Sequence, residues 1–238
     1  MTDRQKRGEG VFLLEAVIFD MDGVIADTEP LHARAYIEAL GSFGIHVSES
    51  EYRKAVTEKG KTMAAWFGEL GGDPEQITEL YRRKDSIYFP LLRKLGTPRP
   101  GLLDLLSQLK ESAVPCVLAT SSRRVNAEFL LDLFGLRGYF VLVLALEDVS
   151  RVKPDPEVFL LALEKIGGEP GRTVVIEDSP KGVLAALAAG IPVVVVPTSS
   201  TDRYDFDGAA LRVESLEDLS VEKLDALLES QRRGRISA

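Results

Sequence analysis

The stretch FDMDGVIADTEPLH, residues 19–32, decides how this chain of 238 residues folds. Its first residue, Phe19, ends the apolar run Ala16–Phe19, whose composition is typical of a buried strand. Two carboxylates, Asp20 and Asp22, come directly after that run. Close anions repel each other, so these two either turn apart into solvent or share a divalent cation, and oxygen-rich sites suit Mg²⁺. Both interpretations stay open at this point.

Four more short apolar runs recur along the chain, with leucine and alanine at helical spacing between them. The runs are Val114–Ala119, Phe140–Leu146, Thr173–Ile176 and Ile191–Val196. The helical patterns cover Leu102–Lys110, Val125–Phe134, Pro156–Ile166 and Pro180–Ala189. Strands that are apolar on both faces and alternate with helices predict a parallel sheet covered on both sides. The fold class is therefore α/β, with a doubly wound core.

One stretch breaks this alternation. From Pro30 to Leu95 the sequence shows amphipathic helical patterns and no convincing buried strand, which predicts a helical insertion after the first strand. The expected helices are Leu31–Phe43, Ser48–Val56, Met63–Leu70 and Pro74–Leu95. The segment Gly96–Gly101, rich in Pro and Gly, returns the chain to the sheet. The expected parts are a discontinuous core at 11–29 and 96–228, a helical cap at 30–95, and flexible tails at 1–10 and 229–238.

Polar side chains at three further places could complete a site. Glu177 and Asp178 follow the run TVVI, Thr120 opens the turn TSSRR, and Lys153 lies in RVKPDPEVF. Each also has a purely structural interpretation, as a helix cap, an acidic helix start or a surface lysine. Ligands of open parallel sheets bind beyond the carboxyl ends of the strands, so side chains that end strands should converge there.

As a set, these segments resemble a known family. FDMDGV, LATSS, VKPDP and VIEDSPKG occur in the order of the four motifs of the haloacid dehalogenase (HAD) superfamily of Mg²⁺-dependent phosphotransferases, and the resemblance covers about residues 13–225. It implies a Rossmann-like core with a cap inserted after the first motif. It also implies that Asp20 is the nucleophile that forms an aspartyl-phosphate, and that Asp22 protonates the leaving oxygen and then activates water. True haloacid dehalogenases lack the second aspartate, which argues against carbon–halogen chemistry.

The same resemblance implies a metal site and a phosphate site. The ligands of Mg²⁺ would be a side-chain oxygen of Asp20, the backbone carbonyl of Asp22, Asp178 and, either directly or as a partner of the other ligands, Glu177. The transferring phosphoryl oxygens would be bound by Thr120, the Ser121 backbone and Lys153. The implied activity is that of a phosphoric monoester hydrolase.

The segment GVIADTEPLHARAY, residues 23–36, most resembles the corresponding segment in the branch that contains sugar-phosphate phosphatases and β-phosphoglucomutase. Candidate substrate residues in the cap are Lys59, which matches a substrate-contacting lysine of the mutase, and Lys61. The mutase carries an arginine where Met63 stands here, and an arginine there would grip the distal phosphate of a bisphosphorylated intermediate. His32 is either a hinge or proton-relay residue or a packed histidine.

Three functions therefore remain in view. A phosphatase acting on a small phosphorylated metabolite, such as a sugar phosphate, is the first. A phosphosugar mutase is the second, and the loss of the arginine weighs against it. The third, from another class, is an inactive binding or regulatory protein on the same fold, which would be expected to lack a nucleophile, acid or metal ligand. All of these are present in this sequence.

The composition sets the class of partner. Lys and Arg number 29 against 37 Asp and Glu, a net charge of −8 at pH 7, which disfavours nucleic acid and anionic membranes and leaves a small molecule. No run reaches the roughly 18–20 apolar residues of a membrane-spanning helix. The single cysteine, Cys116, gives no sign of an oxidising compartment, so a cytoplasmic protein is expected. A cap that closes over the core within one chain makes a monomer sufficient.

Overall fold

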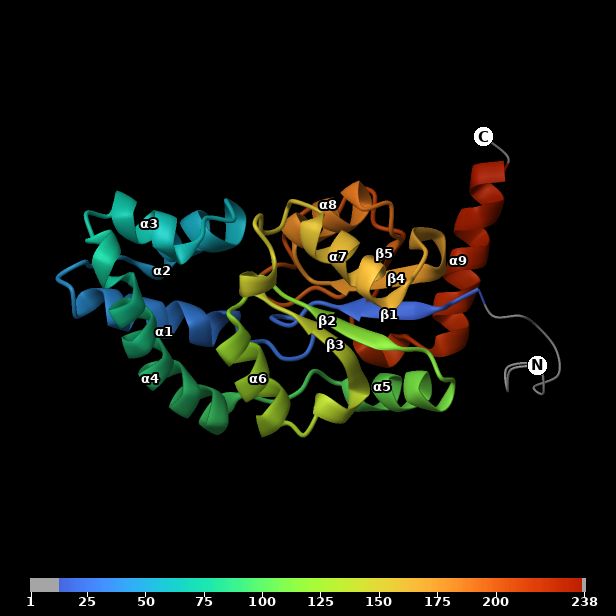
Figure 1. Ribbon diagram of the computed structural model, residues 1–238, viewed down its shortest axis with the longest axis horizontal. Helices are drawn as coiled ribbons and strands as arrows, with labels where there is room; N and C mark the ends of the chain where they lie inside the picture. The colour runs from blue at the N-terminus through green and yellow to red at the C-terminus, as the bar shows by residue number, and fades with distance from the viewer. Residues whose placement is uncertain (1–12, 237–238) are drawn as a thin grey trace.

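Strand β1 (Ala16–Phe19) lies inside a six-stranded parallel sheet with the order β3-β2-β1-β4-β5-β6 (Figure 1). The computed structural model describes residues 13–236. The other strands are β2 (Cys116–Ala119), β3 (Phe140–Leu144), β4 (Thr173–Glu177), β5 (Val193–Val195) and β6 (Leu211–Arg212). This is a doubly wound order, so the predicted α/β fold class is confirmed.

The pairing of β1 with its two neighbours aligns the carboxyl ends of three strands. Phe19, the last residue of β1, lies opposite Leu118 of β2 and Ile176 of β4. The backbone N–H of Asp20 continues the ladder by donating to the carbonyl of Ile176 at 2.9 Å. Residues that follow these strands therefore meet at one edge of the sheet, as expected for a doubly wound fold.

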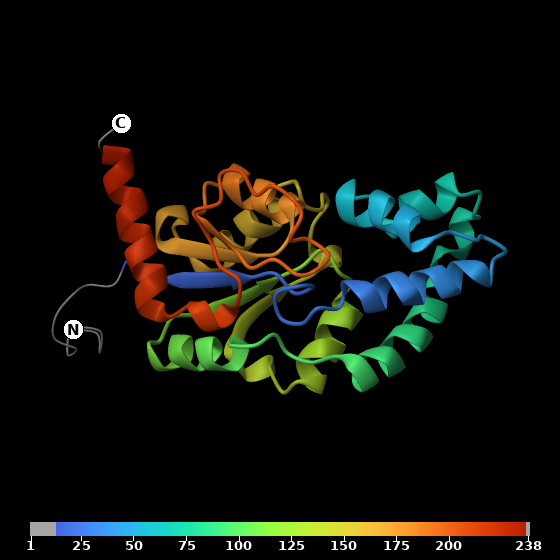
Figure 2. The ribbon, with the colours of Figure 1, turned by 180° about the vertical axis from the view of Figure 1, so that it is seen from behind.

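Helices cover both faces of the sheet, and β1 alternates between the two cores. Val17 and Phe19 pack with α5 (Leu102–Glu111), α6 (Arg124–Leu133) and α9 (Val221–Ile236), whereas Ile18 packs with α7 (Glu157–Ile166) and α8 (Pro180–Ala188). Figures 1 and 2 show α5 and α6 on one side of the sheet and α7 and α8 on the other. A strand that is apolar at every position suits burial on both faces.

The predicted helical insertion is a layer of helices beyond the carboxyl ends of the strands (Figure 2). It consists of α1 (Glu29–Gly41), α2 (Glu49–Tyr52), a π-helical segment (Arg53–Glu58), α3 (Met63–Glu69) and α4 (Ile77–Leu95). Its own core is rich in aromatic side chains, with Tyr52, Trp66 and Phe67 all buried. The exact boundaries of cap and core stay a prediction.

The C-terminal part of the chain differs from expectation. Residues 229–236 were predicted to be a tail, but they continue helix α9. The helix begins with Val221, Leu224 and Leu228 buried against the sheet, and the pair Glu229–Arg233, with 3.1 Å between charged atoms, supports its next turn. Residues 1–10 and 237–238 lie outside the described residues. Within residues 13–236, no helix has the length and apolar character needed to cross a membrane.

A buried lysine ties the cap to the core. Lys84 of α4 is fully buried, and its ammonium donates to Oδ1 of Asn126 on α6 at 3.2 Å. The neighbouring Asp85 accepts a bond from Arg123 at the start of α6, with 2.8 Å between Oδ2 and Nη1. Burial lowers the pKa of Lys84 to about 8, although the charge of Asp85 opposes that shift. Burial of the charged Lys84 ammonium at the junction of α4 and α6 therefore lowers the free energy of unfolding.

This cost predicts a pH-dependent stability. The pKa of Lys84 lies below its ordinary value of 10.5, so between about pH 8 and 10.5 the unfolded chain binds a proton that the folded chain has lost. For this group the free energy of unfolding therefore rises with pH through that window. We expect the stability of the wild type relative to Lys84→Met to increase by about 2 kcal/mol from pH 7 to 9.5, measured by urea unfolding. Lys165→Met, on the exposed side of α7, is the control. A difference that stays constant with pH would contradict the prediction.

Candidate active site

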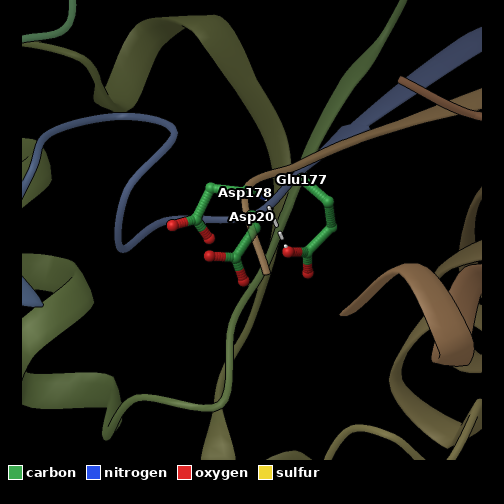
Figure 3. Close-up of side chains that lie close together, drawn as sticks. All are labelled: Asp20, Glu177 and Asp178. Atoms are coloured by element: carbon green, nitrogen blue, oxygen red, sulfur yellow. Dashed lines mark hydrogen bonds between the residues drawn. The ribbon is translucent and has the colours of Figure 1, made fainter. Parts of the chain in front are cut away.

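Three buried carboxylates meet at the ends of β1 and β4. Asp20 follows β1, Glu177 ends β4, and Asp178 comes next in the chain. One oxygen from each carboxylate lies within 4.8 Å of the others, and Figure 3 shows the three side chains next to one another. The paired strands carry residues 157 positions apart in the sequence to this edge, which is the convergence that the sequence predicts.

Lys153 supplies the positive charge of the cluster. Its ammonium lies 2.5 Å from Oδ1 of Asp20 and 2.6 Å from Oε1 of Glu177, and it also donates to the carbonyl of Ala119 at 3.0 Å. Burial disfavours the charged ammonium, but the charges of Asp20 and Glu177 outweigh burial and raise the pKa of Lys153 above its usual range. Lys153 is therefore held as a cation on the carboxylate of the predicted nucleophile.

Two glycines make room for the carboxylates. A Cβ atom on Gly23, whose φ is +90°, would lie 2.1 Å from Oδ2 of Asp178. A Cβ atom on Gly182, in the first turn of α8, would lie 1.8 Å from Oε1 of Glu177. Glu177 also accepts hydrogen bonds from the N–H groups of Asp178 and Ser179, at 3.1 and 3.2 Å. The acidic pair is thus packed and oriented from several sides, beyond what a helix cap requires.

The residues present fit a divalent cation. The three carboxylates are ion-paired with one ammonium, that of Lys153, so their formal negative charge exceeds the paired positive charge by two, as much as such a cation carries. Burial raises the pKa of Asp20 to about 7, with Lys153 opposing the shift. Burial, reinforced by the charges of Glu177 and Asp20, also raises the pKa of Asp178. Oxygen donors of this kind suit hard cations.

The carboxylate of Asp22 is held separately, by hydrogen bonds. Its Oδ1 accepts a short hydrogen bond from Thr28 and lies 3.1 Å from Nε2 of His32, while its Oδ2 accepts from Ser122 Oγ at 2.5 Å. Burial would raise the pKa of Asp22, but His32 and these hydroxyl donors outweigh it and hold the pKa well below its usual range. The carboxylate is therefore ionised here, the state in which it accepts a proton. The metal ligand predicted from this residue, its backbone carbonyl, stays a prediction.

Above the carboxylates lies a pocket lined by both parts of the chain. The sequence-predicted residues that line it are Asp20, Asp22, His32, Lys61, Thr120, Ser121, Lys153 and Asp178. Lys61 is also ion-paired with Glu69. His32 is buried, with its ring stacked on Tyr88 at 4.1 Å between centroids. Lys59, in contrast, is exposed and is not among the lining residues.

Sequence reasoning missed some of these contacts. The bond from Ser122 joins residues 100 positions apart, and the turn TSSRR gives no sign of a bond to Asp22. The pocket also includes Arg123 and Lys181, which lie two and three residues beyond the predicted site residues Ser121 and Asp178. Their position beside the motifs was the available signal, but a charged residue next to a motif is equally typical of the surface.

The fit at Gly182 gives a test of the cluster. Gly182→Ala places a methyl group where the Glu177 carboxylate lies, so Glu177 must move away from Lys153. We expect the free energy of unfolding to fall by about 3 kcal/mol, because a buried ion pair is broken, and affinity for Mg²⁺ to fall with it. Urea unfolding and calorimetric titration with Mg²⁺ measure the two effects.

Gly68→Ala is the matched control for this variant. It is also a glycine within a helix, α3, but a Cβ atom there has no neighbour within 4 Å. We expect it to leave Mg²⁺ affinity unchanged and to stabilise the chain by up to about 1 kcal/mol. Equal unfolding midpoints for Gly182→Ala and the wild type would show that the close contact at Glu177 is not a constraint.

Comparison with known proteins finds relatives that are similar in sequence and in fold. Protein CbbY of Cereibacter sphaeroides is 32% identical over 217 residues, covering 87% of this chain and 94% of that protein. The phosphorylated carbohydrates phosphatase of Thermotoga maritima is 35% identical over 182 residues, covering 75% and 82%. The crystal structure of a mutant CbbY from Rhodobacter sphaeroides in complex with xylulose-(1,5)bisphosphate superimposes with a TM-score of 0.80 at 28% identity, covering 87% of this chain and 96% of that one.

A match at the level of the family extends over most of the chain. Residues 14–190 match the sequence pattern of the family described as haloacid dehalogenase-like hydrolase. That range includes all four motifs, the helical insertion and the acidic cluster. This chain therefore belongs to the haloacid dehalogenase-like hydrolase family.

Proposed function

We propose that this chain is a Mg²⁺-dependent phosphatase that hydrolyses a small phosphorylated sugar. The observation that carries the proposal is the contact of the Lys153 ammonium with Asp20 Oδ1 at 2.5 Å, inside the acidic cluster and at the floor of the pocket. A carboxylate can attack an anionic phosphate only where positive charge offsets the repulsion between them. Two relatives named for phosphatases of phosphorylated carbohydrates and of fructose 1-phosphate support the choice of substrate class.

In the first step, an Asp20 oxygen forms a bond to phosphorus, and the bond from phosphorus to the sugar oxygen breaks. This leaves an aspartyl-phosphate and a sugar oxygen that takes a proton from Asp22. For that step Asp22 must be protonated, which its present bonds to Thr28, His32 and Ser122 disfavour. Substrate that draws these donors away would let Asp22 hold the proton.

In the second step, water attacks phosphorus and the bond from phosphorus to Asp20 breaks. Asp22, by then ionised, takes a proton from the attacking water. The hydrogen bonds that lower the pKa of Asp22 then favour release of this proton, which restores the ionised carboxylate. Lys153 and the Thr120–Ser121 turn hold the phosphoryl oxygens through both steps, since all three residues line the pocket beside Asp20.

Mg²⁺ would be held by Asp20, the backbone carbonyl of Asp22 and Asp178, with Glu177 as a ligand or a partner of the ligands, and when bound it neutralises charge as a carboxylate approaches a phosphate. Glu177 already accepts three hydrogen bonds through one oxygen, from two backbone N–H groups and from the hydroxyl of Ser179. This arrangement favours the role of a partner that orients Asp178 and Lys153.

The nucleophile gives the main test. We expect p-nitrophenyl phosphate to be hydrolysed with Mg²⁺ and not with EDTA, and Asp20→Asn to lower kcat by about 10³-fold or more, because an amide oxygen is a poor nucleophile and the Lys153 pair is lost. Asp104→Asn, on the exposed side of α5, is the control that should keep full activity. Equal phosphate release by Asp20→Asn and the wild type would refute the phosphatase, and an inactive binding protein would become the better account.

A second assay separates hydrolysis from mutase activity. Met63 is buried in the cap at the position where the mutase carries an arginine, and it offers no charge to a distal phosphate. Given β-glucose 1-phosphate and a trace of its 1,6-bisphosphate, we expect inorganic phosphate to appear faster than glucose 6-phosphate, because water and not a second sugar takes the phosphoryl group. Coupled assays measure the rate at which each product forms. Faster formation of glucose 6-phosphate than of inorganic phosphate would favour the mutase over the phosphatase.

A further inference from the structure

A carboxylate at the start of α1 lines the same pocket, and the proposed mechanism does not use it. Glu29 is the first residue of α1, and it is partly buried among the pocket residues. Its Oε1 accepts a hydrogen bond at 2.5 Å from the hydroxyl of Thr57, which lies 28 residues further along the chain, in the cap. Within residues 13–236, no group donates a hydrogen bond to its other carboxylate oxygen, Oε2.

The position of Glu29 needs more than a helix start to explain it. The helix dipole favours an acidic residue in the first turn of any helix, but it does not select where the side chain lies. Glu49, the first residue of α2, is exposed and does not line the pocket. Burial raises the pKa of Asp178 in the core and of Tyr52 in the cap, and the charge of Glu29 adds to both shifts. Glu29 therefore acts on groups from both walls of the pocket.

Glu29 lies on the side of the pocket from which the leaving group departs. The residue before it, Thr28, donates a hydrogen bond to Oδ1 of Asp22, the proposed acid for the leaving oxygen. The transferring phosphoryl group has its own donors in Lys153 and the Thr120–Ser121 turn. A carboxylate repels a phosphoryl group, because both are anionic. The part of the substrate that Glu29 can bind is therefore the leaving alcohol.

An ionised carboxylate only accepts hydrogen bonds, so its match on the leaving alcohol is a donor. A hydroxyl group fits better than an ammonium, because Lys61 and Lys181 also line the pocket and would repel a further cation. We propose that Glu29 binds a hydroxyl group of the leaving alcohol and thereby selects phosphate esters of polyhydroxy compounds. Thr57 holds the carboxylate through Oε1, and Oε2 accepts from the substrate. This inference rests on the proposed phosphatase activity and names a specificity residue of the same pocket.

Esters with and without hydroxyl groups on the leaving alcohol test the proposal. The probes are glucose 6-phosphate, fructose 1-phosphate, fructose 6-phosphate and ribose 5-phosphate against p-nitrophenyl phosphate, all at saturating Mg²⁺. For the sugar phosphate with the highest wild-type kcat/KM, we expect Glu29→Ala to lower the ratio of its kcat/KM to that of p-nitrophenyl phosphate by about 10-fold or more, the size of a charged hydrogen bond. The loss should come chiefly from a higher KM for the sugar phosphate, because binding and not chemistry is removed.

Three further variants complete the design. Glu29→Gln keeps an acceptor oxygen and should lower the ratio less than Glu29→Ala does. Thr57→Val removes the hydroxyl that holds Glu29 and should lower the ratio in the same direction by a smaller factor. Glu49→Ala, which removes the first acidic residue of another cap helix outside the pocket, should leave the ratio and both kcat/KM values unchanged.

The possible failures are distinguishable. If the wild type hydrolyses none of the four sugar phosphates, or if Glu29→Ala changes kcat/KM for the sugar phosphate and for p-nitrophenyl phosphate by the same factor, the role of Glu29 is refuted. Mg²⁺-dependent hydrolysis of p-nitrophenyl phosphate by the wild type in that case leaves the phosphatase proposal standing. Absence of Mg²⁺-dependent hydrolysis of every phosphate ester would instead refute the proposed function itself.

Discussion

The buried ion pairs of Lys153 with Asp20 and Glu177 are the interaction on which the rest of the structure depends. Taking charges out of water costs several kcal/mol per ion, and mutual attraction repays this only in close geometry. Here the ammonium lies 2.5 and 2.6 Å from the two carboxylates. Two strands and the loop before α7 must therefore keep their relative positions, and the Asp20 carboxylate cannot move without leaving a buried charge unpaired.

The parallel sheet is what makes this geometry stable. β1 pairs with β2 on one side and β4 on the other, so the groups that follow each strand face one space. Packing then has to admit two adjacent acidic side chains, and Gly23 and Gly182 do so by lacking a Cβ atom. Two features therefore fix the position of the carboxylates. The backbone hydrogen bonds between β1 and its neighbouring strands place the strand ends, and the two glycines leave space for the acidic side chains.

The cap contributes several of the residues that line the pocket, among them Lys61 and Met63. The cap has an aromatic core of its own, and the Lys84–Asn126 and Asp85–Arg123 contacts join α4 to α6. Across the pocket, Glu58 joins the cap loop to the core through Tyr204. With contacts on both sides, the cap encloses the space above Asp20. In the proposed phosphatase, the size and charge of that space would select the leaving group, and the acidic cluster would carry out the chemistry.

The strands and the acidic residues that follow them were predictable from sequence, because each depends on a short local pattern. Four apolar residues precede Asp20, and the run TVVI precedes the Glu177–Asp178 pair. The insertion was predictable because its helical patterns interrupt the alternation of strands and helices. Helix α9 and the short β6 were not predicted, since neither has a motif and both are stabilised by packing against the finished sheet. Only the tertiary structure decided that Ser122 bonds to Asp22, and that Lys61 lines the pocket whereas Lys59 does not. The physical reason is distance: a residue type and its neighbours determine a strand end or a turn, but which charges meet depends on segments a hundred or more residues apart being brought together by the sheet.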